Sequence, residues 1–170
     1  VVVATVRALK NHGGAPKNTL AQEDLGALER GLPNLLQHVE NITQVFGLPC
    51  VVALNEFPTD TEAELSLVAE RCRQLGVREG GTALASEVVR LCQQPSQFRF
   101  CYDPEMSIEE KLNAIARKVY RADGVTLTAG AAKQLRELTE LGFDKLPICM
   151  AKTQYSFSDD AARLGAPRGF

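Results

Sequence analysis

The stretch CVVALNEFPTDTEAE, residues 50–64, carries the clearest fold signal in this sequence. Its first five residues are an apolar run without alternation, which is typical of a strand covered on both faces in a parallel sheet. Thr61 and Glu64 have the spacing of a capping box, in which two side chains and two backbone N–H groups pair reciprocally at the start of a helix. The stretch therefore predicts a buried strand, a loop and a helix, which is the repeating unit of α/β proteins.

The same order of elements is expected earlier, in VVVATVRALKNHGG at residues 1–14. Val1–Val6 predicts a second buried strand, and we expect the polar residues after it to form a loop that ends in Gly13–Gly14. Helical spacing of apolar residues over 32–46 predicts the following helix. Because such sheets bind ligands at the carboxyl ends of their strands, the loops after these two strands are where we expect a site.

The second half predicts a smaller α/β unit. Short apolar runs predict strands at Phe98–Tyr102 and Leu146–Ala151, and capping signals at Ser107 and Thr128 predict two helices between them. A further helix is expected between Gly80–Gly81 and Gln94. We therefore expect an α/β fold with a mostly parallel sheet and flanking helices. Its expected parts are a large nucleotide-binding α/β domain (1–96), a smaller α/β subdomain (97–145), and a strand and loop that return to the active-site cleft (146–170).

The composition narrows the class of protein. The chain has 170 residues, is 45% hydrophobic, and carries 19 Lys and Arg against 21 Asp and Glu. The net charge of −2 argues against the basic surface that nucleic-acid binding usually requires. No apolar run approaches the roughly 20 residues that cross a bilayer, and there is no signal-peptide pattern. We therefore expect a cytoplasmic globular protein with neither nucleic acid nor membrane as partner.

The five cysteines show no Cys-x₂-Cys spacing, which argues against a zinc site or a redox pair. Each lies in an apolar segment, so we expect buried, reduced thiols in a reducing compartment. They are Cys50, Cys72, Cys92, Cys101 and Cys149.

Polar residues follow the predicted strands. Arg7, Lys10 and His12 beside two glycines fit an anion site for phosphate or carboxylate, and they also fit a solvated basic turn. Asn55 can hydrogen-bond a ligand. Lys152 can pair with an anion or merely cover the sheet edge.

Other features are less specific. Tyr155 and Phe157 alternate with serines, which fits either a packed edge or a stacking platform for a flat ring. His38 is expected at the surface of its helix. The sequence has no G-x-x-x-x-G-K-[ST] loop, no G-x-G-x-x-G, no G-x-S-x-G elbow and no metal-ligand spacing. These motifs alone assign no metal site and no independent enzyme activity.

Four stretches nevertheless resemble the formate–tetrahydrofolate ligase (formyltetrahydrofolate synthetase) family. They are VATVRALK with HGG (3–14), VALNEFPTDTE (52–62), YRADGV (120–125) and GFDKLPICMAKTQYS (142–156). The similarity covers nearly the whole chain in one order. Around Tyr155–Ser158 it is closer to the bacterial single-function form than to the fused eukaryotic form.

The resemblance implies an ATP-dependent ligase of phosphate-loop NTPase-like fold that makes formyltetrahydrofolate in one-carbon metabolism. In this family the γ-phosphoryl group of ATP passes to formate, and the folate nitrogen then attacks the formyl phosphate. The implied substrates are formate, ATP with Mg²⁺ and tetrahydrofolate, with a possible monovalent cation and a homotetrameric assembly. The resemblance places Arg7, Lys10 and His12 as catalytic residues facing the formyl phosphate.

The same resemblance implies a set of substrate-binding residues. Asn55, Lys152 and Thr153 would line the nucleotide and folate cleft. Tyr155 matches a position where the family places an aromatic ring against the pterin. The family's stacking partner for that ring corresponds here to Leu127.

Two departures from the family pattern shape the expectation for this chain. The family's phosphate loop lies upstream of every matched segment, so we expect an internal fragment that is inactive without the remainder of its parent chain. Family members also have a longer stretch containing glycine and tryptophan where Val77–Glu79 precedes Gly80–Gly81 here, which indicates a deletion or an absent loop. The alternative function is a non-catalytic α/β module that binds a folate-like ring or a partner chain.

Overall fold

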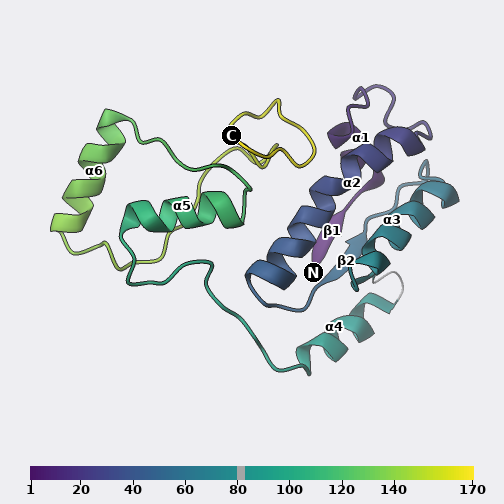
Figure 1. Ribbon diagram of the computed structural model, residues 1–170. Coiled ribbons are helices and arrows are strands. Elements are labelled where there is room, and N and C mark those ends of the chain that lie inside the picture. The colour runs from purple at the N-terminus through teal and green to yellow at the C-terminus, as the bar shows by residue number, and fades with distance from the viewer. Residues whose placement is uncertain (80–82) are drawn as a thin grey trace.

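The computed structural model describes residues 1–79 and 83–170 and has an α/β architecture (Figure 1). In chain order the elements are β1 (Val2–Ala4), α1 (Val6–His12), α2 (Leu25–Glu40), the π-helical turn η1 (Asn41–Val45), β2 (Val51–Leu54), α3 (Glu62–Gln74), β3 (Arg78–Glu79), α4 (Leu84–Cys92), α5 (Ile108–Lys118) and α6 (Ala129–Glu140). One helix was expected between Gly80–Gly81 and Gln94. The expected start of this helix lies outside the described residues, and α4 forms the part of the helix that follows.

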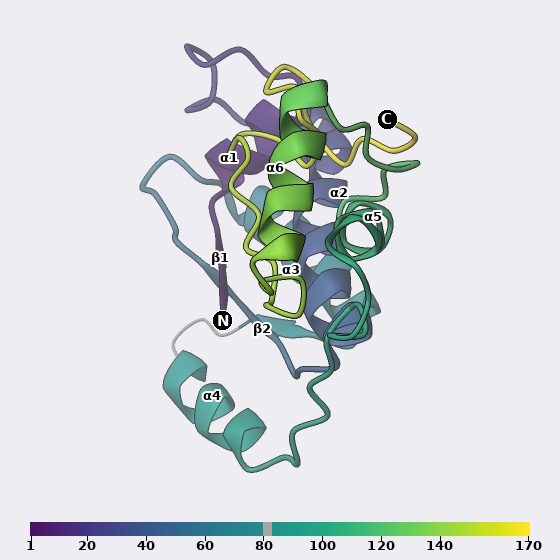
Figure 2. The same ribbon diagram turned by 90° about the vertical axis from the view of Figure 1, so that its left-hand side faces the viewer.

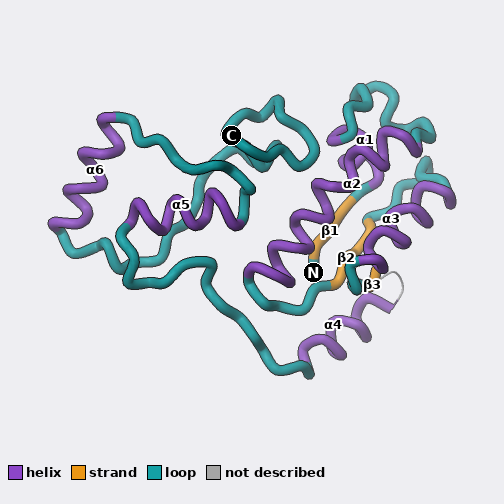
Figure 3. The backbone as a smooth tube through the Cα atoms, viewed as in Figure 1, coloured by secondary structure: helices purple, strands orange, loops and turns teal. Residues whose placement is uncertain are grey.

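The strands form one parallel sheet in the order β1–β2–β3. Val2 pairs with Val52, and Val51 pairs with Arg78. This confirms that both apolar runs of the first half form strands. The burial expected for the first strand is wrong, because β1 lies at the edge of the sheet and Val3 is 68% exposed. In Figure 3 the strands lie together on one side of the molecule, and helices and loops make up the rest. The described residues form only this small sheet, so the NTPase-like fold stays a prediction.

The main core lies between the sheet and helices α1, α2 and α3 (Figure 1). Helix α3 begins with the predicted capping box, because the Thr61 side chain accepts from the Glu64 N–H and the Glu64 side chain accepts from the Thr61 N–H. The buried side chains include Val6 and Leu9 from α1, Leu28, Leu32, Leu35 and Val39 from α2, Val52 from β2, and Val68 and Cys72 from α3.

The prediction of a loop after the first strand is wrong, because the chain passes directly from β1 into helix α1. Thr5 Oγ1 accepts from the Ala8 N–H at 3.1 Å and caps this helix. Val6 and Leu9 then fall on one helical face and are both buried. The apolar run therefore serves two elements: its first part pairs in the sheet and its last valine begins the helical face.

Two glycines allow α1 and α2 to cross at backbone contact. A Cβ on Gly31 would lie 1.8 Å from the Leu9 carbonyl oxygen, and one on Gly13 would lie 1.7 Å from the Ala27 carbonyl oxygen. Gly13 therefore has a packing role, and it is not part of an open anion-binding loop.

The strands expected at 98–102 and 146–151 are not formed. Phe98 and Leu146 are half exposed, and the two segments meet through a side chain: Tyr102 Oη accepts from the Ile148 N–H at 2.9 Å. An isolated pair of strands is only marginally stable in water, and the sheet of the first half does not reach these segments. The part over 97–145 thus contains α5 and α6 without a strand. The division at 96 and 145 stays a prediction.

The capping signals in this half are confirmed. Ser107 forms a capping box with Glu110 at the start of α5, and Thr128 caps α6. Figure 2 shows α6 in front of the rest of the molecule and α4 near the N-terminus. Helix α6 has no fully buried residue, and its leucine stripe is only partly covered by the described residues.

The irregular tail joins the two halves. Asn34 Nδ2 on α2 donates to the Gly165 carbonyl at 2.8 Å, and the Asp123 N–H donates to the Phe170 carbonyl at 3.0 Å. In Figure 1 this segment runs between α5 and α1.

The cysteines only partly match the expectation. Cys50, Cys72 and Cys101 are buried, but Cys92 and Cys149 are exposed. The segment around Cys149 lacks the strand that would have buried it. None of the helices among the described residues is both long and apolar enough to span a bilayer.

Candidate functional site

A cavity of about 400 Å³ lies where helix α2, the end of α5 and the loop over residues 150–157 meet, and we call it the central cavity. Helix α1 contributes His12, α2 contributes Asn34 and His38, and the π-helical turn contributes Asn41. Tyr120 lines it from beyond the end of α5. Turns of this π-helical kind are frequent at functional sites, which makes the cavity the best candidate in the fold.

Two histidines face this cavity. His12 Nδ1 accepts from the Gly165 N–H at 3.2 Å, and the His38 ring lies 4.4 Å from the Phe157 ring, centroid to centroid. Burial lowers the pKa of both imidazoles. The positive charges of His12 and Lys152 lower the pKa of His38 further. The three groups are therefore close enough to influence one another.

Lys152 is held at the cavity by backbone oxygens. Its Nζ donates to the Thr153 carbonyl at 2.7 Å and to the Ser156 carbonyl, and it lies 5.2 Å from the centroid of the Tyr120 ring. Burial lowers the pKa of Lys152, and the charge of Asp159 offsets part of this effect. The lysine thus shapes the 150–157 loop while keeping its charge at the cavity.

Asn41 carries an unused hydrogen-bond acceptor. Its side chain is only 5% exposed, and its Nδ2 donates to the Val119 carbonyl at 2.9 Å. Its Oδ1 has no hydrogen-bond partner among the described residues. A buried acceptor without a partner is costly, so a donor supplied by a ligand or water in the cavity would stabilise it.

Tyr155 lies on the cavity with its side chain 62% exposed. Leu127, its expected stacking partner, does not line the cavity. The aromatic rings that do line it besides Tyr155 are Phe46, Tyr120 and Phe157. The cavity therefore combines flat apolar faces with cationic groups.

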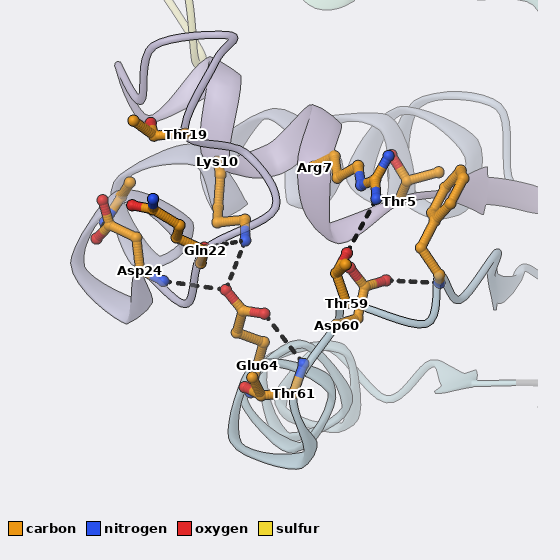
Figure 4. A network of polar contacts seen from close by, with 12 residues as sticks. Thr5, Arg7, Lys10, Thr19, Gln22, Asp24, Thr59, Asp60, Thr61 and Glu64 are labelled. Carbon is orange, nitrogen blue, oxygen red and sulfur yellow. Dashed lines mark hydrogen bonds and ion pairs between the residues drawn. The ribbon is translucent and has the colours of Figure 1, made fainter.

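Lys10 lies elsewhere, in a buried network (Figure 4). Its Nζ donates to Glu64 Oε1 at 2.8 Å and to the Gln22 carbonyl at 2.7 Å. The same Glu64 oxygen accepts from the Asp24 N–H at 3.1 Å. Burial by itself raises the pKa of Glu64, but the hydrogen bonds from Lys10, Asp24 and Thr61 together hold it below its usual value.

Arg7 and Asn55 lie at the carboxyl ends of β1 and β2, as expected, but away from the central cavity. Arg7 donates to Thr59 Oγ1 at 2.9 Å (Figure 4). Its guanidinium carbon lies 4.3 Å from the Phe57 ring centroid. The Asn55 N–H donates to the Ala4 carbonyl at 2.9 Å and extends the sheet ladder. These contacts hold the loop after β2 against the start of α1.

The structure thus brings four of the expected site residues together, His12, Lys152, Thr153 and Tyr155, and leaves Arg7, Lys10, Asn55 and Leu127 outside the cavity. Sequence reasoning missed Asn34, His38 and Asn41. Their spacing of i, i+4 and i+7 puts them on one helical face, and this polar stripe was the available signal.

A parallel α/β fold with a cavity lined by aromatic and basic side chains defines a class of protein in which small-molecule sites are common. Comparison with known families makes this specific. The family model of formate–tetrahydrofolate ligase matches residues 1–170, and the chain belongs to that family. It is similar to the formate–tetrahydrofolate ligase of Symbiobacterium thermophilum, with 49% identity over 181 residues, covering 100% of this chain and 33% of that relative. The chain therefore spans about a third of the length of this curated relative.

Proposed function

We propose that this chain is part of an ATP-dependent ligase that forms formyltetrahydrofolate from formate and tetrahydrofolate through formyl phosphate. The match of the family model to the whole chain carries this proposal. The structure adds that four expected site residues, from two parts of the sequence that lie about 140 positions apart, line one cavity. The remainder of the parent chain would supply the phosphate loop for ATP. The enzyme would act in one-carbon metabolism in the cytoplasm as a homotetramer.

The role of this segment is to bind and orient substrate. Tyr155 presents an exposed ring at the cavity, where it would stack on the pterin of tetrahydrofolate. Thr153 Oγ1 accepts from the Tyr155 N–H at 3.3 Å and helps to fix that backbone. Lys152 would contribute positive charge where negative charge develops during acyl transfer.

Mg²⁺ with ATP, and a monovalent cation, are further expectations for the parent enzyme. The described residues contain no group of three His, Cys, Asp or Glu side chains that could hold a metal ion. We therefore assign no residue of the described part of this chain to Mg²⁺ and derive no step through the ion.

Calorimetric titration of the chain with tetrahydrofolate tests the proposed binding role. We expect Tyr155→Ala to weaken binding by about tenfold, because stacking on an aromatic ring is worth about 1–3 kcal/mol. Phe98→Ala is the matched control, since Phe98 is an exposed aromatic that does not line the cavity. Equal affinity of the wild type and Tyr155→Ala would remove Tyr155 from the pterin site.

A second assay tests the division of labour within the parent protein. Residues 1–170 alone are expected not to form formyltetrahydrofolate from ATP and formate, because this sequence has no phosphate loop. Product formation by the purified chain, at a rate that survives repeated purification, would overturn that part of the proposal.

A further inference from the structure

Three basic side chains line the central cavity. His12, His38 and Lys152 all line it, and none of the described lining residues is an aspartate or glutamate. The charge of Asp159, which does not line the cavity, raises the pKa of Lys152. Burial lowers the pKa of all three groups, and an anion in the cavity would favour their protonated forms. The cavity is therefore suited electrostatically to a negative ligand.

The geometry leaves each group able to donate to such a ligand. His12 Nδ1 is used as an acceptor for the Gly165 N–H, so the proton of the neutral ring is on Nε2. His38 is oriented by its contact with Phe157. Lys152 uses two of its N–H groups on the Thr153 and Ser156 carbonyls and keeps a third.

The three groups also come from independent parts of the fold. His12 ends α1, His38 lies in the last turn of α2, and Lys152 lies on the 150–157 loop. The tail fixes the first of them through Gly165, which Asn34 of α2 also holds at 2.8 Å. Such an arrangement is preorganised, because the ligand need not order a flexible segment in order to meet all three groups.

We propose that His12, His38 and Lys152 form an anion subsite of the central cavity that binds a phosphate group. A phosphate group offers these three donors more acceptor oxygens than a carboxylate does, and lysine is a common phosphate ligand. The inference deepens the proposed ligase function and rests on it, since that reaction handles phosphate as a free product and as an acyl phosphate. His38, which sequence reasoning placed at the surface, becomes a binding residue.

Histidine NMR tests this directly, because the sequence contains only two histidines. The imidazole resonances of the 170-residue chain are assigned with His12→Gln and His38→Gln and are followed against pH, with and without inorganic phosphate at constant ionic strength. We expect phosphate to raise the pKa of His38 by about one unit, because a bound anion favours the protonated ring. The same titration is repeated with acetate as the carboxylate probe and with acetyl phosphate as the acyl phosphate probe.

The outcomes separate clearly. A saturable shift with phosphate or acetyl phosphate, larger than with acetate, supports the subsite, and the tighter of the two phosphate probes identifies the source. No shift with either phosphate probe, or an equal shift with acetate, overturns it. If tetrahydrofolate still binds in the calorimetric titration while phosphate does not, the proposed function survives and only this inference fails.

A variant supplies the second test. Lys152→Met is expected to weaken phosphate binding by about tenfold, because it removes a charge-assisted donor. Lys133→Met is the matched control, since Lys133 is an exposed lysine on α6 that pairs with Glu137 at 3.7 Å. Unchanged phosphate affinity in a folded Lys152→Met chain contradicts the proposal. If that variant does not fold, the wild-type titration decides.

Discussion

Lys10 Nζ lies 2.8 Å from Glu64 Oε1, and neither side chain is more than 1% exposed. The pair joins α1 to the first turn of α3 across the end of the sheet (Figure 4). Gln22 and Asp24 complete the network from the loop that precedes α2. The resemblance implied that Lys10 is a catalytic residue. The structure instead places Lys10 inside the protein, where Glu64 neutralises its charge.

Removal of the lysine should therefore destabilise the fold strongly. Lys10→Met leaves the Glu64 carboxylate buried without its counter-ion, which costs about 3–5 kcal/mol. Urea unfolding measures the free-energy difference. The exposed pair of Lys133 and Glu137 provides the control, because Lys133→Met should change stability by less than about 1 kcal/mol.

A double variant distinguishes this mechanism from simple loss of packing. Lys10→Met with Glu64→Gln removes the stranded charge and retains one oxygen, which can accept from the Asp24 N–H or from the Thr61 N–H but not from both. We expect the double variant to be more stable than Lys10→Met alone. If the two variants unfold at the same urea concentration, charge burial is not the cause of the destabilisation.

Acid should weaken the same network. The pKa of Glu64 is lower in the folded chain than its usual value, so the carboxylate contributes stability above the unfolded pKa of about 4.3–4.5. This contribution is lost as the pH falls below that value and through the folded pKa. Glu64→Gln should therefore flatten the fall in unfolding free energy at acid pH. Glu62→Gln, at an exposed glutamate in the same helical turn, should leave the slope nearly unchanged.

The helix crossing predicts opposite effects for two glycines of α2. Gly31→Ala forces a Cβ against the Leu9 carbonyl and should cost about 3 kcal/mol, because backbone must move to relieve the overlap. Gly26→Ala meets only the side-chain ends of Arg30 and Asp24, at 3.4 Å and 3.5 Å, and should gain up to about 1 kcal/mol from helix propensity. Thermal unfolding of both variants compares the two effects, and equal shifts would contradict the crossing geometry.

Local signals explain what could be predicted from the sequence. The caps at Thr61, Ser107 and Thr128 were predicted correctly because a capping side chain and its N–H partner lie within three residues of each other. The burial of Lys10 could not be predicted in this way, because its partner lies 54 positions further along the chain. His12 and Tyr155 were candidates from the residues and from the resemblance, whereas the place of His38 beside them depends on how α1, α2 and the 150–157 loop pack together.

The two strands that were expected and not formed show the same dependence on distant partners. Residues 98–102 and 146–151 have the composition of strands, but a strand also needs a neighbour to satisfy its backbone. Here a side chain takes that role, because Tyr102 Oη accepts from the Ile148 N–H. Lys111 adds a second clamp by donating to the Asp144 carbonyl at 2.6 Å.

This contact yields the last prediction. Tyr102→Phe keeps the buried ring but removes the acceptor, so the Ile148 N–H loses its protein partner. We expect a loss of about 1 kcal/mol in unfolding free energy and faster amide hydrogen exchange at Ile148. The exchange of the Val119 N–H, which donates to the Ile115 carbonyl within α5, serves as an internal control and should not change. Ile148 lies two residues before the cavity loop that begins at Met150. Faster exchange at both Ile148 and Val119 would indicate general loosening of this half and would contradict a local clamp. A change confined to Ile148 would assign to Tyr102 the anchoring of the loop that carries Lys152 and Tyr155.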